Sequence, residues 1–182
     1  MKFVKPVELE LKNESERQYY EYILNHYKLL KKAYVIFTQA LKKMLPGCTR
    51  ELISKRMQKH DLSKFSEDEF SQYAQYFFPE DGKEPDKDLF DQAWKHHYQN
   101  NDHHPEFYWK DDGASLPMSD DAIAEMILDW IAMTFQTKVP IRHWYMNNKK
   151  KLRFNSNTKN KLDFIMNQRV WNKLDRMLIG KR

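Results

Sequence analysis

The stretch "NESERQYYEYILNHYKLLKKAYVIFTQALKKM", residues 13–44, has the spacing of a long amphipathic helix. Its apolar side chains recur at steps of three and four residues, which gathers them on one helical face. The residues on this face are Tyr19, Tyr22, Ile23, His26, Leu29, Leu30, Ala33, Phe37, Ala40, Leu41 and Met44. Pro46-Gly47 ends the pattern. A helix of this length predicts a fold built mainly from helices.

Start signals for further helices recur along the chain. Thr49 can cap a second helix that runs into His60-Asp61. The tetrapeptide "SEDE", residues 66–69, has the form of a capping box, in which the serine and the last glutamate cap the helix start. This box would open a third helix that turns four side chains inward: Phe70, Tyr73, Ala74 and Phe77.

The second half of the chain continues in the same way. A fourth helix has Phe90, Trp94 and His97 on one face, and Ser119 can cap a fifth. Pro140 is well placed as the first residue of a sixth helix. A last helix from about residue 158 would bury Leu162, Ile165, Met166, Val170 and Leu174. We find no alternating strand pattern, so we predict an all-α bundle of about seven helices in one domain, residues 1–182, with its core at about 13–178.

Composition narrows the class of protein. The chain has 182 residues, 41% of them apolar, which is enough for a sizeable core. A single cysteine, Cys48, excludes an internal disulfide and fits a reducing, cytoplasmic compartment. No apolar run approaches the roughly 18 residues that a membrane span needs, so we expect no membrane partner. The formal net charge of +5 favours anionic partners such as phosphates, nucleotides or nucleic acid.

The stretch "KHDLSKF", residues 59–65, places His60 beside Asp61. The pair alone fits either a polar helix end or a metal site. Other polar residues in apolar surroundings are needed to distinguish the two. His26 lies on the apolar face of the first helix, where an imidazole costs desolvation unless something bonds it. Asp129 lies between Leu128 and Trp130, where a carboxylate needs a cation or several donors. The alternative for His26 is a core histidine that bonds a neighbouring side chain. The alternative for Asp129 is a buried ion pair with a lysine or arginine.

The densest histidine signal is "HHYQNNDHH", residues 96–104. If the fourth helix continues that far, His97 and His104 share its inward face, and His96 and His103 share the adjacent face. We therefore predict His97 and His104 as metal ligands, with His96 and His103 as close rivals. The alternative is a solvated, histidine-rich turn. Mixed imidazole and carboxylate ligands suit Fe, Mn, Zn, Co or Ni and do not select among them.

These motifs resemble known families. The segment "HDLSK" resembles the His-Asp-x-x-Lys signature of the HD-domain metalloprotein superfamily. More closely, "HDLSKFS", "AWKHHYQNNDHH" and "EMILDW" resemble a family of short bacterial and phage proteins of uncharacterised activity, over about residues 15 to 170. The resemblance implies an HD-like helical bundle that holds one or two divalent transition metal ions. It also implies His26, His60, Asp61 and Asp129 as the primary ligands, with Asp61 placed to bridge two ions.

The function that these features favour is metal-dependent hydrolysis of a nucleotide or other small anionic phosphoester. A bound metal can lower the pKa of its water from 15.7 to about 7. Asp61 would take part directly, and Lys64 could neutralise a phosphate oxygen as charge develops. Glu125 lies four residues before Asp129, on the same helical face, and could orient a ligand or the attacking water. The alternatives are a surface lysine for Lys64 and a charge at the rim for Glu125.

Two other functions fit the same residues. One is an HD-fold di-iron oxygenase, because extra histidines beside the His-Asp pair also occur in proteins that activate oxygen. The other is a non-catalytic, metal-containing module that binds a nucleotide or a protein. In such a module an aromatic stripe could stack on a base, although such stripes more often belong to the core. The residues of the stripe are Trp94, Tyr98, Phe107, Tyr108 and Trp109. Nucleic acid is a weaker candidate partner, suggested by the basic run "NNKKKLRF", residues 147–154.

Overall fold

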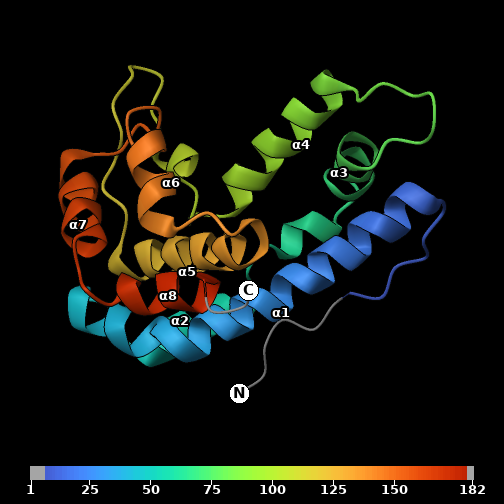
Figure 1. Cartoon of the computed structure of the whole chain (residues 1–182). Coiled ribbons are helices and arrows are strands. Elements are labelled where there is room, and N and C mark those ends of the chain that lie inside the picture. Colours follow the sequence, from blue (N-terminus) through green and yellow to red (C-terminus); the bar gives the residue numbers. More distant parts are fainter. Residues whose placement is uncertain (1–6, 180–182) are drawn as a thin grey trace.

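A computed structural model of the chain describes residues 7–179, which form eight α-helices and two short 3₁₀-helices, with no β-strand among the described residues (Figure 1). The α-helices are α1 (Glu14–Met44), α2 (Arg50–Met57), α3 (Phe70–Phe77), α4 (Lys87–Asn100), α5 (Asp120–Thr137), α6 (Ile141–Asn148), α7 (Ser156–Met166) and α8 (Trp171–Ile179). The 3₁₀-helices are η1 (Leu62–Phe65) and η2 (Pro105–Tyr108). The predicted all-α fold is therefore confirmed.

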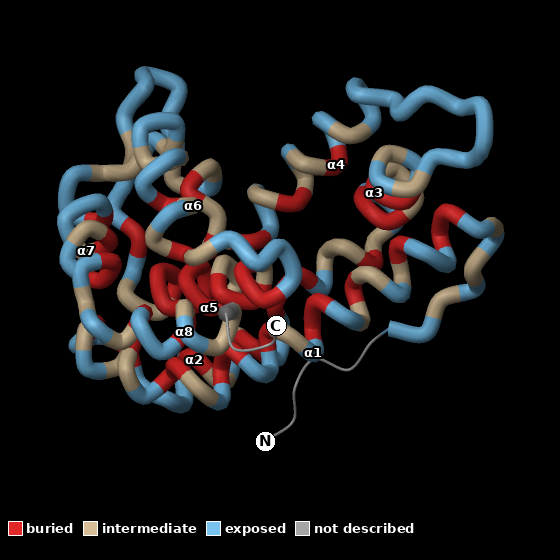
Figure 2. The backbone as a smooth tube through the Cα atoms, viewed as in Figure 1, coloured by how far each residue is buried: buried red, intermediate tan, exposed pale blue. Residues whose placement is uncertain are grey.

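Two long helices, α1 and α5, form the centre of the bundle. Asn13 caps α1 by accepting the backbone N–H of Glu16, and Ser119 caps α5 by accepting that of Ala122. The two helices pack along each other, and Figure 2 shows buried positions over most of α5 and along one side of α1. Because α5 is apolar on most of its surface, it has to be covered by neighbours all round. Any polar side chain on its buried faces therefore needs a partner inside the protein.

The other helices cover this pair from two sides. In Figure 1, α3 and α4 lie together on the right, where α3 packs on α1, and α6 and α7 lie on the left. The short α2 packs on both α1 and α5, with Thr49 as its predicted cap. No helix within residues 7–179 has the length and apolar character to cross a membrane. The segment between α3 and α5 forms α4 and η2, and it contains the histidines of residues 96–104.

The last predicted helix is two helices. The chain leaves helical geometry after Met166 and starts again at Trp171. The indole N–H of Trp171, which is fully buried, donates to the carbonyl oxygen of Ile165 at 2.7 Å. Its ring packs on Phe37 of α1, with ring centroids 5.7 Å apart. The break between α7 and α8 lets the indole bond the end of α7 and lets this large side chain be buried, which a continuous helix would not allow.

The predicted capping box at residues 66–69 is wrong. Glu69 precedes α3, but neither residue makes the side-chain cap bond, and the Ser66 hydroxyl is buried without a partner. Glu69 is fully buried and bonds His96 and His97 instead. Phe77, predicted to face inward, is 51% exposed. The Glu69 side chain therefore bonds α4, about 27 residues further along the chain, and does not cap α3. The local sequence pattern does not reveal this contact.

The fourth helix, α4, ends at Asn100, before the His103-His104 pair that the prediction placed on it. Asn101 has extended backbone geometry, and its side-chain amide donates to the carbonyl oxygen of His97 at 2.7 Å. That carbonyl would otherwise accept the backbone N–H of the next helical turn. The same amide donates to Ser63 at 2.7 Å, which ties the helix end to η1. His103 and His104 consequently lie in a turn, where their directions do not follow helical phase.

Candidate metal centre

Seven histidine and aspartate side chains converge between α1, α5, the end of α4 and the turn at His60-Asp61. They form two groups, and within each group one ligand atom per residue lies within 4.8 Å of the others. The first group is His26, His60 and Asp129. The second group is Asp61, His97, His103 and His104. All five histidines direct Nε2 toward the other ligand atoms, a common orientation that separate core histidines would not need.

Asp61 joins the two groups. Its Oδ2 lies 3.3 Å from Nε2 of His60, and its Oδ1 lies 3.4 Å from Nε2 of both His97 and His103. The residue has φ of 56°, in the left-handed region that aspartate tolerates better than most residues. The Tyr27 hydroxyl donates to the carbonyl oxygen of His60 at 3.2 Å and so braces this turn. Each carboxylate oxygen of Asp61 therefore faces one group.

The first group rests on regular helices. His26 projects from α1 and Asp129 from α5, and His26 Nε2 lies 3.1 Å from Asp129 Oδ1. His60 Nε2 lies 3.5 Å from His26 Nε2 and 3.8 Å from Asp129 Oδ1. Among the described residues, the side chains that pair with Asp129 are these two histidines rather than a lysine or arginine. The packing of α1 against α5 thus brings the predicted His26 and Asp129 together with His60.

The second group contains three histidines. His97 Nε2 lies 3.0 Å from His104 Nε2, and the rings of His103 and His104 have centroids 4.2 Å apart. His96 lies apart, since its Nδ1 donates to Glu69 at 2.7 Å and its side chain is 33% exposed. The structure therefore brings the predicted His97 and His104 together, adds one rival, His103, and leaves out the other, His96. Both histidines of the 103–104 pair point inward because they lie in the turn beyond α4.

Two buried glutamates hold the outer nitrogens of these imidazoles. Glu125 Oε1 accepts from Nδ1 of His60 at 2.8 Å and lies 3.5 Å from Nδ1 of His103. Glu69 Oε2 accepts from Nδ1 of His97 at 2.8 Å. A proton held on Nδ1 by a carboxylate leaves the Nε2 lone pair free to bind a cation, which is a frequent arrangement around metal ions. Glu125 has the place expected of a residue that orients a ligand, whereas Glu69 was predicted only as a helix cap.

Arg56 on α2 anchors Glu125 from the other side. Its guanidinium bonds Glu125 Oε2, Asp102 and, at 2.9 Å, Asp121. Burial alone would lower the pKa of Arg56, but the nearby carboxylates, Glu125 first, raise it above its ordinary value. This cluster fixes α2, α5 and the histidine turn against one another. Sequence reasoning missed Arg56, because nothing within its own helix distinguishes it from other surface arginines.

The charges of the two groups differ. Burial would lower the pKa of His60, but the neighbouring carboxylates, Asp61 first, raise it to about 9. Burial would raise the pKa of Asp129, but His26 lowers it to about 2. In the second group, burial and the neighbouring His97 lower the pKa of His104 to about 3, and burial likewise lowers that of His103. The first group thus attracts a positive charge, and His103 and His104 are neutral imidazoles with free lone pairs.

Unpaired polar atoms indicate that the residues fit a metal ion. Asp61 Oδ1 and His103 Nε2 are buried without a hydrogen-bond partner, although they lie only 3.4 Å apart. Leaving a polar group buried and unpaired costs about 1–3 kcal/mol. One cation between them would accept lone pairs from both. Nitrogen and carboxylate donors together suit the first-row transition metals.

The centre meets solvent beside Asp129 and Lys64. The side chain of Asp129 is 16% exposed, against 4% for His26 and none for His60. Lys64 is 20% exposed, and its Nζ lies 2.6 Å from Asp61 Oδ2. Burial would lower the pKa of Lys64, but Asp61 and then Asp129 raise it, so the side chain stays charged. The charged ammonium of Lys64 therefore lies at the partly exposed side of the centre.

A family model matches residues 15–178 of the chain, and that family is DUF5662, described as a family of unknown function. The chain belongs to the DUF5662 family. The match includes every residue of both groups, together with Glu69, Glu125, Arg56 and Lys64. No curated protein and no solved structure matches the chain. Since the DUF5662 description assigns no activity, a functional assignment has to rest on the chemistry of this site.

Proposed function

We propose that this protein is a metal-dependent phosphohydrolase with a two-metal centre, of the kind found in the HD-domain superfamily. The observation that carries the proposal is the position of Asp61, whose two carboxylate oxygens face two separate groups of imidazole and carboxylate ligands. A carboxylate in this position suits two neighbouring cations. Metal ions held there would polarise a phosphoryl oxygen and supply an activated water.

The protein's own residues then have separate tasks. His26, His60 and Asp129 would hold one ion, and His97, His103 and His104 the other, with Asp61 shared. The outer carboxylates keep the imidazole rings in the binding tautomer, so the ligands need little rearrangement when an ion binds. The anionic products of hydrolysis would leave by the side of the centre that is open to solvent.

Lys64 would bind the phosphate. Its ammonium lies at the partly exposed side of the centre, next to Asp61 and close enough to Asp129 to feel its charge. A phosphate oxygen that enters on this side meets a fixed positive charge, which stabilises negative charge that develops during phosphoryl transfer. This cation favours an anionic substrate, as the proposed hydrolysis requires.

A phosphoester panel tests the proposal. Purified protein is analysed for its metals, then assayed with monoesters and diesters in added Mn²⁺, Ni²⁺, Co²⁺ or Mg²⁺. We expect phosphate release that needs metal, and a fall of about 10²–10³ in kcat for Lys64→Met. Lys59→Met, at an exposed lysine nearby, is the matched control and should leave the rate unchanged.

Two results would overturn the proposal. Bound metal without turnover of any phosphoester would favour a non-catalytic binding module. Turnover that consumes oxygen, with a visible absorption band from bound iron, would favour the di-iron oxygenase. Each alternative leaves the metal centre in place and changes only the chemistry.

A further inference from the structure

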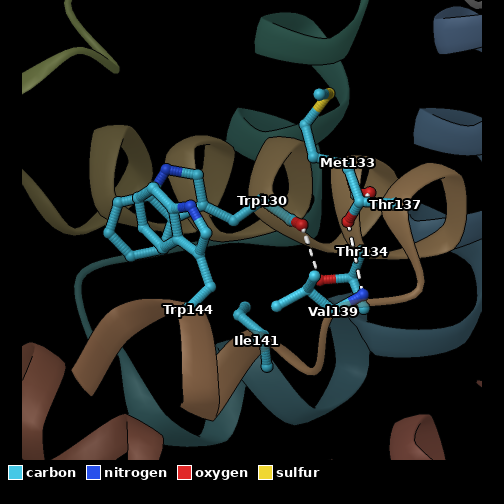
Figure 3. A pocket seen from close by; sticks show the side chains of 7 residues that line it. All are labelled: Trp130, Met133, Thr134, Thr137, Val139, Ile141 and Trp144. Carbon is cyan, nitrogen blue, oxygen red and sulfur yellow. Dashed lines mark hydrogen bonds between the residues drawn. The ribbon is translucent and has the colours of Figure 1, made fainter. Parts of the chain in front are cut away.

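A pocket of about 190 Å³ lies between α5 and α6 (Figure 3). Its principal lining residues are Trp130, Met133 and Thr134 of α5, with Val139, Ile141 and Trp144 from the following loop and α6. The two tryptophan rings contact each other in a tilted arrangement at the pocket wall, with centroids 4.7 Å apart and planes at 52°. None of the sequence features used above, and no part of the proposed mechanism, accounts for this pocket.

The pocket is built for an uncharged group. No charged side chain lines it. The Thr134 hydroxyl donates to the carbonyl oxygen of Trp130 at 2.9 Å, and the Thr137 hydroxyl donates to that of Met133 at 2.9 Å. Both hydroxyl protons are therefore used within α5. A charged ligand would lose its hydration here without a replacement.

Its size and walls suit a flat ring. A cavity of about 150 Å³ lined by apolar side chains is enough to hold benzene, and this pocket is somewhat larger at about 190 Å³. Trp130 and Trp144 offer aromatic faces, and offset or edge-to-face contacts between rings add to the energy of simple burial. One aromatic ring, or a small fused ring, matches this space better than a long chain would.

Met133 links the pocket to the neighbourhood of the metal centre. Met133 lies four residues after the ligand Asp129, which is about one helical turn, or about 6 Å, along α5. Across from it, Tyr22 lies four residues before the ligand His26 on α1, and its hydroxyl is 4.0 Å from the Met133 sulfur. The Tyr22–Met133 pair is thus the next layer beyond the His26–Asp129 pair. Met133 lines the pocket as well, so it forms the edge between pocket and centre.

We propose that this pocket binds an uncharged aromatic ring carried by the substrate whose phosphate lies at the metal centre. The inference rests on the proposed function and specifies its substrate class, an aryl or heteroaryl phosphoester. Lys64 and the metal ions would take the anionic end, and the tryptophan-lined pocket the ring.

Binding of phenol, measured by saturation-transfer NMR in the presence of chelator, tests the pocket without any metal or turnover. Thr137→Phe fills the pocket from its exposed rim with little risk to the core. Gln136→Phe, at the neighbouring exposed position outside the pocket, is the matched control. We expect phenol to bind wild type and Gln136→Phe, and binding to be lost in Thr137→Phe. Absence of binding to wild type, or equal binding to both variants, would overturn the proposal.

A kinetic comparison then ties the pocket to the centre. With metal present, Thr137→Phe should raise KM for phenyl phosphate by about tenfold and leave hydrolysis of methyl phosphate unchanged. An equal effect on both esters would overturn the ring subsite while hydrolysis itself stands. Phenol binding without hydrolysis of any ester would instead contradict the proposed function and leave the ring site intact. The two failures are therefore distinguishable.

Discussion

The two groups of the candidate centre are built in different ways. The first, His26, His60 and Asp129, depends on two long helices packed side by side, with His60 just after a third. The second takes His97 from the end of α4 and two histidines from the turn beyond it. A helix fixes the direction of each side chain by its phase, whereas a turn is fixed by contacts with other parts of the chain. Helical phase therefore accounts for the inward direction of His26 and Asp129, whereas it accounts for the second group only in part.

The surroundings of the two groups differ in charge as well. The first group contains Asp129, shares Asp61, and has Lys64 nearby. The second has one shared carboxylate and three imidazoles, and depends on Glu69 to orient His97. We expect the first group to bind its ion more tightly, because two carboxylates face it. Four predictions test this contrast, in order of decreasing effect.

The largest effect should come from Asp61, which serves both groups. Asp61→Asn keeps the size of the side chain and suits the left-handed backbone, so the fold should persist. Loss of the shared negative charge should remove both metals and reduce phosphate release to background. Metal content and circular dichroism measure the two outcomes. Asp68→Asn, at an exposed aspartate nearby, is the control, and a variant Asp61→Asn that retains two ions would show that Asp61 is not shared.

Loss of a histidine from the turn should affect one group only. His103→Ala should leave about one metal ion per chain, because the first group remains complete. His104→Ala should have a similar effect, since both side chains lie in the second group. His96→Ala should keep the wild-type metal content, because His96 bonds Glu69 from outside the cluster. A larger loss from His96→Ala than from His103→Ala would contradict the observed end of α4.

The orienting glutamates should have smaller and separable effects. Glu69→Gln should weaken binding of the second ion by about 10–100-fold and spare the first. Glu125→Gln should weaken both, because Glu125 faces His60 and His103. Competition with a fluorescent chelator gives the two affinities. The exposed Glu67→Gln serves as control, and equal effects of Glu69→Gln on both ions would remove the distinction between the groups.

The smallest effect is a dependence of metal affinity on pH. His60 in the metal-free protein keeps its proton up to about pH 9, so an ion that binds Nε2 has to displace it. From pH 7 to pH 8, affinity at the first group should rise by about tenfold, with about one proton released per ion bound. Calorimetry in buffers of different ionisation enthalpy measures the proton count. His103 and His104 are already neutral, so they should release no proton when an ion binds the second group. Proton release from these two histidines would contradict the difference in charge between the groups.

The same titration affects the stability of the metal-free protein. The raised pKa of His60 stabilises the fold fully below pH 6.5, and this contribution is lost as the pH rises through about 9. The lowered pKa of His104 makes the fold more stable as the pH rises from about 3 to 6.5, because the unfolded chain binds the proton more readily in that range. Thermal melts of chelated protein should therefore be highest near pH 6.5.

Sequence reasoning succeeded where a helix carries the signal. The spacing around His26 and Asp129 predicted both helices and their inward faces, and the resemblance to the HD-domain superfamily implied that these two side chains meet. Glu125, one turn before Asp129, was placed by the same rule. The pattern from about residue 158 predicted one last helix, whereas the structure has two there, because Trp171 bonds the carbonyl oxygen of Ile165 and starts a new helix.

The rest of the site depends on contacts between distant segments. Glu69 was interpreted as a cap of its own helix, although its partners are His96 and His97 on another. Arg56 gains its role only when α2 packs near Asp102 and Asp121. The inward direction of His103 depends on Asn101, which ends α4 by bonding Ser63 and His97. None of these pairings leaves a local pattern, so a single sequence does not reveal them.

The central claim is that Asp61 joins two metal sites. The most direct test is anomalous diffraction from crystals of the protein grown or soaked with Mn²⁺. The claim predicts two peaks, one among His26, His60 and Asp129 and one among His97, His103 and His104, each in contact with a different oxygen of Asp61. A single peak that does not touch Asp61, or no density among these side chains, would contradict it.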